Sequence, residues 1–324
     1  MQWTTSVSIP SNPGLLHHRQ RMVLLGSCFT DNIGRKLREQ GFSVMVNPHG
    51  VLYNPLSIER TLRVLYSDKI YRPEDLHQNG ELYFSFDHHT HFSSLSAEAC
   101  LSGINDRLVR FREDFSQPDV LILSFGTARV YEWLTTDELV ANCHKLPARE
   151  FRHRLVEVDE LSVRLEGLIS WLRAMFPKLI IIFTVSPVRH WKDGAHANQI
   201  SKAHLLLSIE KVIGKFSNLY YFPSYEVMLD ELRDYRFYAD DLLHPSAMAV
   251  NHLYNRFAQS YFTDETLFLA REVGKIAQAM QHRVFFPESE AHRKFKASYR
   301  KKIQELQAAH PYLDLSEAAA YFSD

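Results

Sequence analysis

Asp241 and His244 have the spacing of an acid and base pair in hydrolase chemistry. They stand three residues apart in Asp-Leu-Leu-His-Pro, so the chain can turn back and bring the carboxylate to the imidazole Nδ1. Such a contact fixes the histidine tautomer and leaves Nε2 free to act as a general base. The same spacing also occurs by chance, with the aspartate exposed and the histidine at a helix start. A catalytic role therefore requires a nucleophile elsewhere in the chain.

The turn Gly26-Ser27-Cys28-Phe29-Thr30 offers that nucleophile. An apolar run ends at the glycine, and a helix is expected to begin within a few residues, with Thr30 or Asp31 as its cap. Free N–H groups at a helix N-terminus favour negative charge and lower the pKa of a thiol. Ser27 and Cys28 both qualify as nucleophiles. In the alternative interpretation the turn is structural and the cysteine is a small buried apolar group.

The pattern of strands and helices predicts a three-layer α/β fold of the flavodoxin-like type. Four short runs are apolar on both faces, as in buried parallel strands, at residues 22–25, 120–125, 179–185 and 219–222, and a fifth strand is expected at 42–46. Between and after them, helical periodicity is found at residues 31–40, 93–115, 161–176, 196–216 and 246–262. This alternation implies a parallel five-stranded sheet that is covered by helices on both faces.

Two stretches interrupt the alternation of strands and helices. Hairpins are expected within residues 70–91, with a turn at Asn79-Gly80, and within residues 129–145. Ligands in open α/β sheets bind beyond the carboxyl ends of the strands, so both hairpins are placed to wall a pocket.

We predict a division into an α/β domain, residues 1–262, and a helical extension, residues 263–324. Helices are expected at residues 265–282 and 288–309. The charged stretch at 291–309 is interpreted as a solvated or oligomer-facing surface, with a lid over the pocket as the alternative.

The two chemical segments together resemble a known superfamily. A nucleophile turn after the first strand, with Asp-x-x-His-Pro after the last, resembles the SGNH (GDSL-type) hydrolases. The sequence Gly-Ser-Cys-Phe at 26–29 resembles their GSCFA branch. Further similar segments are Asn-Pro-His-Gly-Val-Leu-Tyr-Asn-Pro at 47–55, Ser-Pro-Val-Arg at 186–189, residues 198–203 and Tyr-Phe-Pro-Ser-Tyr-Glu at 221–226. The resemblance covers roughly residues 20–260 and implies the SGNH hydrolase fold and acyl-transfer chemistry.

Carried over residue by residue, the resemblance implies a triad of Cys28, His244 and Asp241. Cys28 holds the position of the family's serine, two residues after the glycine. Ser27 is the competing nucleophile if the turn is shifted by one residue. A thiolate is a strong nucleophile at neutral pH, so chemistry permits the exchange of serine for cysteine.

The oxyanion hole of the superfamily is only partly matched. Gly50 fits the role of a glycine N–H donor after the second strand. The next motif, Gly-x-Asn, reads Gly126-Thr127-Ala128 here, so Ala128 stands where an asparagine donor is expected. Losing one such donor costs about 10²–10³ in turnover. Asn54 and Thr127 are the candidate substitutes.

Two further polar clusters follow strands of the predicted sheet. Asp87-His88-His89-Thr90-His91 is dense in metal-binding types, and a metal-dependent phosphoesterase is the alternative if another carboxylate converges on it. Its spacing is not that of a strong metal motif, so no metal is expected. Instead His91 or its neighbours line the substrate pocket, or the segment is an exposed loop. Arg189, His190 and Asn198 follow the fourth strand and either orient a polar acyl or sugar group or form a plain loop. No glycine-rich phosphate loop is present, and no cofactor is expected.

Composition limits the partners of the chain. The 324 residues are 45% hydrophobic, which suffices for a full core, and the net charge of -1 disfavours nucleic acid and membrane surfaces as partners. The cysteines, Cys28, Cys100 and Cys143, lack a Cys-x-x-Cys spacing, which favours reduced thiols and a cytoplasmic location. No secretion signal and no membrane-spanning run is recognised.

We therefore predict an SGNH-like esterase or deacylase that cleaves an ester or acetyl group on a small molecule or glycan. An acyltransferase that uses the same covalent intermediate is the nearest alternative. A catalytically silent small-molecule or glycan-binding module is the rival from another class, because Ala128 and Cys28 both depart from the superfamily pattern. The sequence predicts neither the substrate nor the oligomeric state.

Overall fold

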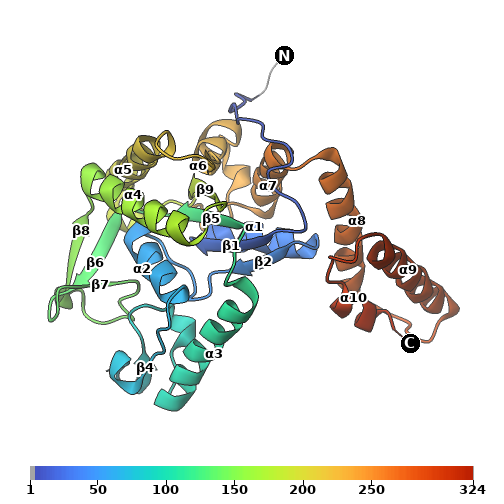
Figure 1. Ribbon diagram of the computed structural model, residues 1–324, viewed down its shortest axis with the longest axis horizontal. Coiled ribbons are helices and arrows are strands. Elements are labelled where there is room, and N and C mark those ends of the chain that lie inside the picture. Colours follow the sequence, from blue (N-terminus) through green and yellow to red (C-terminus); the bar gives the residue numbers. More distant parts are fainter. Residues whose placement is uncertain (1–3, 324) are drawn as a thin grey trace.

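The computed structural model, which describes residues 4–323, is built around one parallel sheet (Figure 1). Its five strands lie in the order β10-β9-β5-β1-β2. They are β1 (Arg21–Gly26), β2 (Ser43–Val46), β5 (Val120–Phe125), β9 (Ile180–Val185) and β10 (Leu219–Tyr221). The chain adds β2 on one side of β1 and the remaining strands on the other, so the strand order reverses between β1 and β5. The carboxyl ends of these two strands are where such sheets bind ligands.

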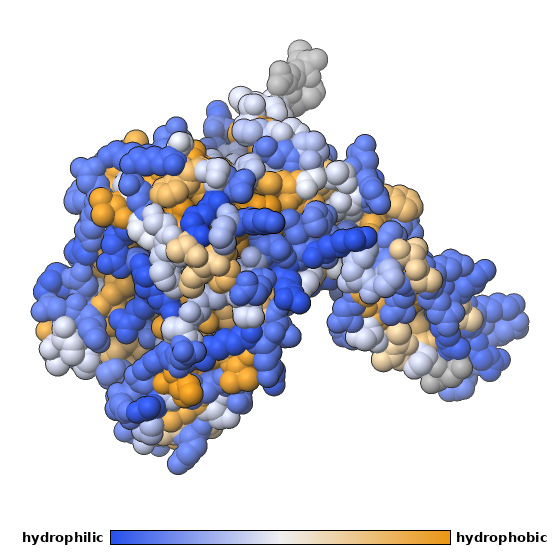
Figure 2. All heavy atoms as spheres, in the orientation of Figure 1, coloured by the Kyte–Doolittle hydropathy of each residue, from blue (hydrophilic) through white to orange (hydrophobic). Residues whose placement is uncertain are grey.

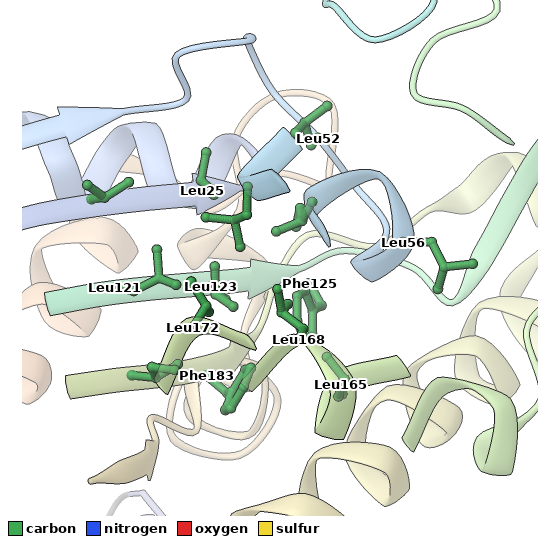
Figure 3. Packing of buried hydrophobic residues seen from close by; sticks show 14 of the residues in the cluster. Leu25, Leu52, Leu56, Leu121, Leu123, Phe125, Leu165, Leu168, Leu172 and Phe183 are labelled. Carbon is green, nitrogen blue, oxygen red and sulfur yellow. The ribbon is translucent and has the colours of Figure 1, made fainter. Parts of the chain in front are cut away.

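Side chains of the strands alternate between two separate apolar cores. In β1, Met22 and Leu24 belong to the core on one face, and Val23 and Leu25 belong to the core on the other. Helices cover both faces, which is why the strand reads as a continuous apolar run. Figure 3 shows the second core, where strand residues meet leucines of α4 (Val158–Met175): Leu25, Leu121, Leu123, Phe183, Leu165, Leu168 and Leu172.

The helices divide between the two faces of the sheet. Helices α1 (Cys28–Glu39) and α7 (Ala247–Tyr261) supply the core on the Met22 face. The Val23 face is covered by α2 (Pro55–Leu65), α3 (Ala97–Phe115), α4 and α5 (Ala195–Ile213). The short α6 (Ser224–Glu226) follows β10 and continues into a π-helical turn over Val227–Glu231. The expected three-layer α/β fold with a parallel five-stranded sheet is confirmed.

Most predicted elements are confirmed to within a few residues, and the differences have local causes. The first helix begins at Cys28 rather than at residue 31, because Ser27 is the extended N-cap residue. Helix α3 begins at Ala97 rather than at 93, where the Ser96 side chain accepts the N–H of Ala99. Helix α2 is not predicted. Its signal was Asn54-Pro55, since the asparagine caps the helix and a proline fits the first turn.

Both predicted hairpins are confirmed. Strands β3 (His77–Asn79) and β4 (Leu82–Phe84) pair across Gly80. Strands β6 (Arg129–Trp133) and β7 (Glu138–Val140) also pair, and β8 (Phe151–Leu155), which is not predicted, adds a third strand to them. The Phe86 carbonyl accepts the N–H of Ala141 at 2.8 Å, so the two excursions support each other.

The C-terminal helices pack at the edge of the sheet where β1 and β2 begin. They are α8 (Asp264–Met280), α9 (Glu290–Ala309) and the unpredicted α10 (Ser316–Tyr321), and they enclose an apolar cluster of their own. Arg19, just before β1, lies 4.5 Å from the centre of the Tyr312 ring, and Gly41, just before β2, faces Val273 and Leu313. Figure 1 shows these helices beside the sheet, and in Figure 2 they form a distinct lobe on the right.

This placement does not fit the lid alternative, because the expected pocket lies at the opposite, carboxyl edge of the sheet. The division of the chain at residue 262 stays a prediction. Within residues 4–323, no helix is long and apolar enough to cross a lipid bilayer.

Gly26→Ala is expected to destabilise the protein by about 2–4 kcal/mol. Gly26 has φ +141°, and a Cβ there would lie 2.1 Å from the Ser124 carbonyl oxygen on the neighbouring strand. Urea unfolding measures the change. The control is Gly103→Ala in α3, where a Cβ meets nothing within 4 Å, and a gain of up to about 1 kcal/mol is expected. Equal effects at the two positions would contradict the role of the close strand approach.

Candidate active site

The turn between β1 and α1 is held from two sides. The Ser27 N–H donates to the Ser124 carbonyl at 3.2 Å, which ties the turn to the end of β5. Asn47, which follows β2, accepts the N–H of Gly26 at 2.9 Å and donates to Asp31 Oδ1 at 2.7 Å. The turn is therefore fixed at the point where the strand order reverses.

Ser27 is enclosed by this arrangement. The residue is 1% exposed, and its Oγ shares a hydrogen bond of 3.1 Å with Ser124 Oγ. It occupies the N-cap position of α1, but its side chain makes no capping bond. A buried hydroxyl that already has a partner is poorly placed to attack an external substrate.

Cys28 is the first residue of α1 and is partly exposed. Burial and the neighbouring Asp31 carboxylate raise the pKa of the Cys28 thiol above its ordinary value. The N–H groups of Cys28 and Phe29 and the charge of Lys202 act in the opposite direction but do not outweigh them. The expectation that the helix N-terminus lowers this pKa is therefore wrong in its net result, and the resting cysteine is a thiol.

Asp241 and His244 form the predicted contact. Asp241 Oδ2 accepts a hydrogen bond from His244 Nδ1 at 2.6 Å, and Oδ1 accepts the N–H groups of Leu243 and His244, each at 2.9 Å. These bonds, those from the two N–H groups first, lower the pKa of Asp241 to about 2. Leu242 has φ +58° and completes the turn that brings the two side chains together. Both side chains are 48% exposed, so the pair faces solvent.

The His244 imidazole does not touch either candidate nucleophile. Within the described residues, no hydrogen bond joins His244 Nε2 to Cys28 Sγ or to Ser27 Oγ. The structure thus contains the predicted Asp241–His244 contact and the predicted turn at Cys28, but not a closed triad. Contacts that tighten only when substrate binds are common at catalytic sites.

His190 and Tyr53 occupy the region near both groups. Their rings meet edge to face with centroids 5.0 Å apart. Burial, together with the charges of Lys202 and His244, lowers the pKa of His190 to about 4 against the opposing effect of Asp193. Burial raises the pKa of Tyr53, and negative charge at Cys28 adds to the effect. His190 is therefore neutral near pH 7 and suits the predicted role in substrate binding.

The predicted oxyanion-hole residues are engaged in bonds that hold the loops together. The Gly50 N–H donates to the Asn47 carbonyl at 2.7 Å. The N–H groups of Gly126 and Thr127 donate to the Tyr53 carbonyl at 2.7 and 2.9 Å.

The two candidate side-chain substitutes are engaged as well. The Asn54 side chain accepts the Ser57 N–H at 2.8 Å and so caps α2. Thr127 Oγ1 pairs with Ser201 Oγ at 2.8 Å. The oxyanion role of all four predicted residues stays a prediction that requires some of these bonds to open. The N–H groups of Cys28 and Phe29 act to lower the pKa of the Cys28 thiol.

Lys202 is a residue of the site that the sequence analysis does not identify. Its side chain is fully buried, its Nζ donates to the Ser186 carbonyl at 2.7 Å, and it lies 5.3 Å from the centre of the Tyr225 ring. Burial lowers its pKa to about 7, and its charge interacts with that of Cys28. A signal existed in the sequence, because Lys202 falls on the same helical face as Asn198, Leu205 and Ile209, all buried.

The histidine-rich segment at 87–91 is mostly structural. His88 is buried and stacks on His49 at 4.2 Å between ring centroids, while Asp87 binds Arg60 and Tyr71. No group of three or more side chains suited to holding a metal occurs in the part of the chain that the structure describes. His91 lies beside Gly50, where a Cβ would be 2.9 Å from the ring, so it is near the predicted pocket rim.

A cavity of about 560 Å³ lies beside the acid–base pair. Its walls come from the loop after β9 and from the segment that leads into the Asp241 turn. They include Arg189, Trp191, Tyr235, Tyr238, Asp241 and Leu243. The aromatic lining is a second feature that the sequence analysis misses, because no regular pattern links Tyr235 and Tyr238 to a site formed by other loops.

Solved structures with a similar chain course were found, but at low similarity. A family 3 carbohydrate esterase of Clostridium thermocellum matches with 11% identity and a TM-score of 0.36, over 79% of this chain and 98% of that one. A family two carbohydrate esterase of the same organism, solved with cellohexaose, matches with 12% identity and a TM-score of 0.36, over 78% of this chain and 64% of that one. A family 3 carbohydrate esterase from Talaromyces cellulolyticus matches with 10% identity and a TM-score of 0.34, over 78% and 99% of the chains.

A search of curated protein sequences found no match. Family models match nearly the whole chain. The model described as the GSCFA family matches residues 21–257, and the one described as the C-terminal domain of GSCFA domain proteins matches residues 273–324. The nucleophile turn and the Asp241–His244 pair both lie within the first match. The chain belongs to the GSCFA family.

Proposed function

We propose that the protein is an esterase or deacylase that works through an acyl-enzyme on Cys28. The observation that carries this proposal is the contact of 2.6 Å between Asp241 and His244, with the carboxylate held by two further N–H groups. An aspartate fixed in this way keeps the proton on Nδ1 and leaves Nε2 as the base.

In the first half of the reaction, His244 Nε2 takes the proton of the Cys28 thiol while the sulfur attacks the ester carbonyl. The tetrahedral intermediate then collapses, and the protonated His244 returns its proton to the departing alcohol oxygen. The product that remains is a thioester on Cys28. Closure of the exposed Asp241–His244 turn on bound substrate is part of this step, since Nε2 must come within hydrogen-bond reach of the sulfur.

In the second half, water attacks the thioester carbonyl. His244 takes one proton from that water, the Cys28 sulfur leaves, and His244 returns the proton to it. The carboxylic acid is released and the resting thiol is restored. An acyltransferase would use an alcohol acceptor in place of water, with the same groups in the same roles.

Two properties support Cys28 over Ser27 as the nucleophile. Cys28 is partly exposed, whereas Ser27 is buried and hydrogen-bonded to Ser124. The N–H groups of Cys28 and Phe29 at the start of α1 act to lower the pKa of the thiol, so they favour negative charge on the sulfur. Because the thiol is un-ionised at rest, a general base is required, and this is the role assigned to His244.

Lys202 supplies positive charge beneath the site. Its ammonium group favours a thiolate on Cys28, and the thiolate in turn favours the ammonium group. In a buried environment such an interaction is stronger than in water. Lys202 is therefore proposed to stabilise negative charge that develops near Cys28.

Cys28→Ala and His244→Ala are expected to prevent accumulation of an acyl adduct on the protein. With p-nitrophenyl acetate as substrate, the first change removes the nucleophile and the second lowers turnover by roughly 10²–10⁴. Intact-mass spectrometry after a short incubation measures the adduct, and p-nitrophenol release measures turnover. Ser27→Ala is expected to keep both, with a loss of stability of about 1 kcal/mol from the hydrogen bond to Ser124.

The control is His282→Ala, an exposed histidine of the C-terminal lobe that is distant in sequence from the site. Loss of the adduct only in Ser27→Ala would assign the nucleophile to the serine. Absence of both adduct and turnover in the unaltered protein with several short esters would favour the binding-module alternative.

Alkylation of Cys28 by iodoacetamide is expected to be slow at pH 7 and to accelerate up to and beyond about pH 9, without an earlier plateau. The reason is that burial and Asp31 raise the pKa of the thiol. Peptide mapping over a pH series measures the rate at this residue. A plateau below pH 8 would instead indicate a preformed thiolate.

Lys202→Met is expected to stabilise the protein more at pH 6 than at pH 10. Burial lowers the lysine pKa to about 7 in the folded state, against an ordinary value of 10.5, so the unfolded chain binds more protons between these values. The contribution of Lys202 to the free energy of unfolding is therefore full above pH 10.5 and is lost as the pH falls through about 7. Urea unfolding at both pH values measures the difference. A difference that does not change with pH would contradict burial of a titrating lysine.

A further inference from the structure

The cavity beside Asp241 contains one charged side chain without a partner. Arg189 makes no ion pair and no hydrogen bond through its guanidinium group within residues 4–323, and its Nε is buried. A guanidinium group with a buried, unsatisfied N–H lowers stability unless another molecule supplies the acceptor. The free donors of Arg189 therefore point to a ligand.

The other charges of the cavity are already matched. Arg233 binds Asp230 at 2.8 Å, and Asp234 binds Arg236 at 2.7 Å. Asp241 is saturated by His244 and two backbone N–H groups. Arg189 is thus the uncompensated cation of this lining.

Arg189 is held in place by its surroundings and lies close to the catalytic groups. Its guanidinium carbon is 5.1 Å from the centre of the Trp191 ring, a stacked arrangement that keeps the planar fork presentable to a planar anion. The positive charge of Arg189 also acts on the interior, because it is one of the causes that lower the pKa of the buried Lys202. Because Arg189 and Asp241 line the same cavity, a ligand on Arg189 lies beside the proposed acid–base pair.

Aromatic faces complete the cavity. Tyr235 is 75% exposed and Trp191 is 50% exposed, and Tyr238 is partly buried beside them. Exposed aromatic rings around a cavity offer flat apolar surfaces that pack against the C–H face of a sugar ring or another flat scaffold. The cavity of about 560 Å³ has room for such a group.

We infer that this cavity binds the alcohol portion of the substrate, and that this portion carries an anionic group that pairs with Arg189. This inference rests on the proposed function, which decides that the cavity holds the alcohol portion of the ester and not the acyl portion. His244 donates its proton to the departing alcohol, and the cavity adjoins the Asp241–His244 turn, so the alcohol portion occupies it. The substrate class is an acylated sugar or similar scaffold that bears a carboxylate or a phosphate.

Binding of unreactive ligands tests the inference without any need for turnover. Isothermal titration calorimetry measures the affinity for methyl glucuronide and for methyl glucoside, which differ by the carboxylate. Glucose 6-phosphate and inorganic phosphate are measured in the same way. The two anionic sugars are expected to bind roughly 10- to 100-fold more tightly than methyl glucoside, as for a charged pair in a partly buried site. The tighter of the two identifies which anion the site prefers.

Arg189→Gln is expected to remove this preference, and Arg189→Lys to retain only part of it because a lysine lacks the planar fork. The matched control is Arg233→Gln in the same cavity, where the charge is already paired, and a change of less than about 3-fold is expected. Thermal unfolding of each variant identifies any loss of folding, and Arg189→Lys remains informative if Arg189→Gln is unstable. Equal binding of the charged and neutral sugars, or an unchanged preference in Arg189→Gln, would overturn the inference. Inorganic phosphate that binds as tightly as the sugars would overturn the role of the aromatic rings.

A parallel assay separates this inference from the proposed function. Acetate release is measured from O-acetylated methyl glucuronide and O-acetylated methyl glucoside. Turnover of both at equal efficiency supports the esterase and overturns the anion inference. Anion binding that depends on Arg189, without release of acetate from either sugar, overturns the esterase and leaves the anion site supported.

Discussion

The site depends on the close approach of β1 and β5 at Gly26. The backbone of Ser124 lies where the Cβ of any other residue would be, so the first strand ends in direct contact with its neighbour. This contact determines where the chain turns. As a result, the Ser27 side chain is directed inward to Ser124, and Cys28 is the first residue of α1 and is partly exposed. A small displacement of the turn would exchange the positions of hydroxyl and thiol. Backbone packing, and not the side chains alone, therefore selects between the two candidate nucleophiles.

Small hydroxyl groups and one lysine fill the carboxyl edge of the sheet beneath that turn. Thr184 and Ser224 share a hydrogen bond of 2.7 Å, as Ser27 and Ser124 do one strand pair away. Lys202 extends from α5 and donates to the Ser186 carbonyl, just after β9. These polar groups are buried and hydrogen-bonded, so the dipoles of this part of the sheet edge are fixed, whereas the charge of Lys202 changes near neutral pH. The movement that the proposed reaction requires is therefore assigned to the exposed Asp241–His244 turn.

The fold was accessible from sequence because its strands are apolar on both faces and its helices carry clear start signals. The Asp241–His244 contact was also accessible, since it is local and follows from a spacing of three residues. Lys202 and the aromatic cavity were not found, because their importance arises from contacts between segments that are distant in sequence. The pKa of Cys28 was predicted with the wrong sign for a similar reason. The helix terminus is visible in the sequence, whereas burial and the orientation of Asp31 are properties of the packed turn.

The C-terminal helices pack at the edge of the sheet that lies opposite the candidate active site. Their contacts with Gly41 and with the residues before β1 involve the edge of the sheet where strands begin, and the reactive groups lie where strands end. Substitutions on the surface of the C-terminal lobe are therefore expected to leave the hydrogen bonds around Cys28 in place. The packing of the lobe and the geometry around Cys28 can therefore change independently of each other.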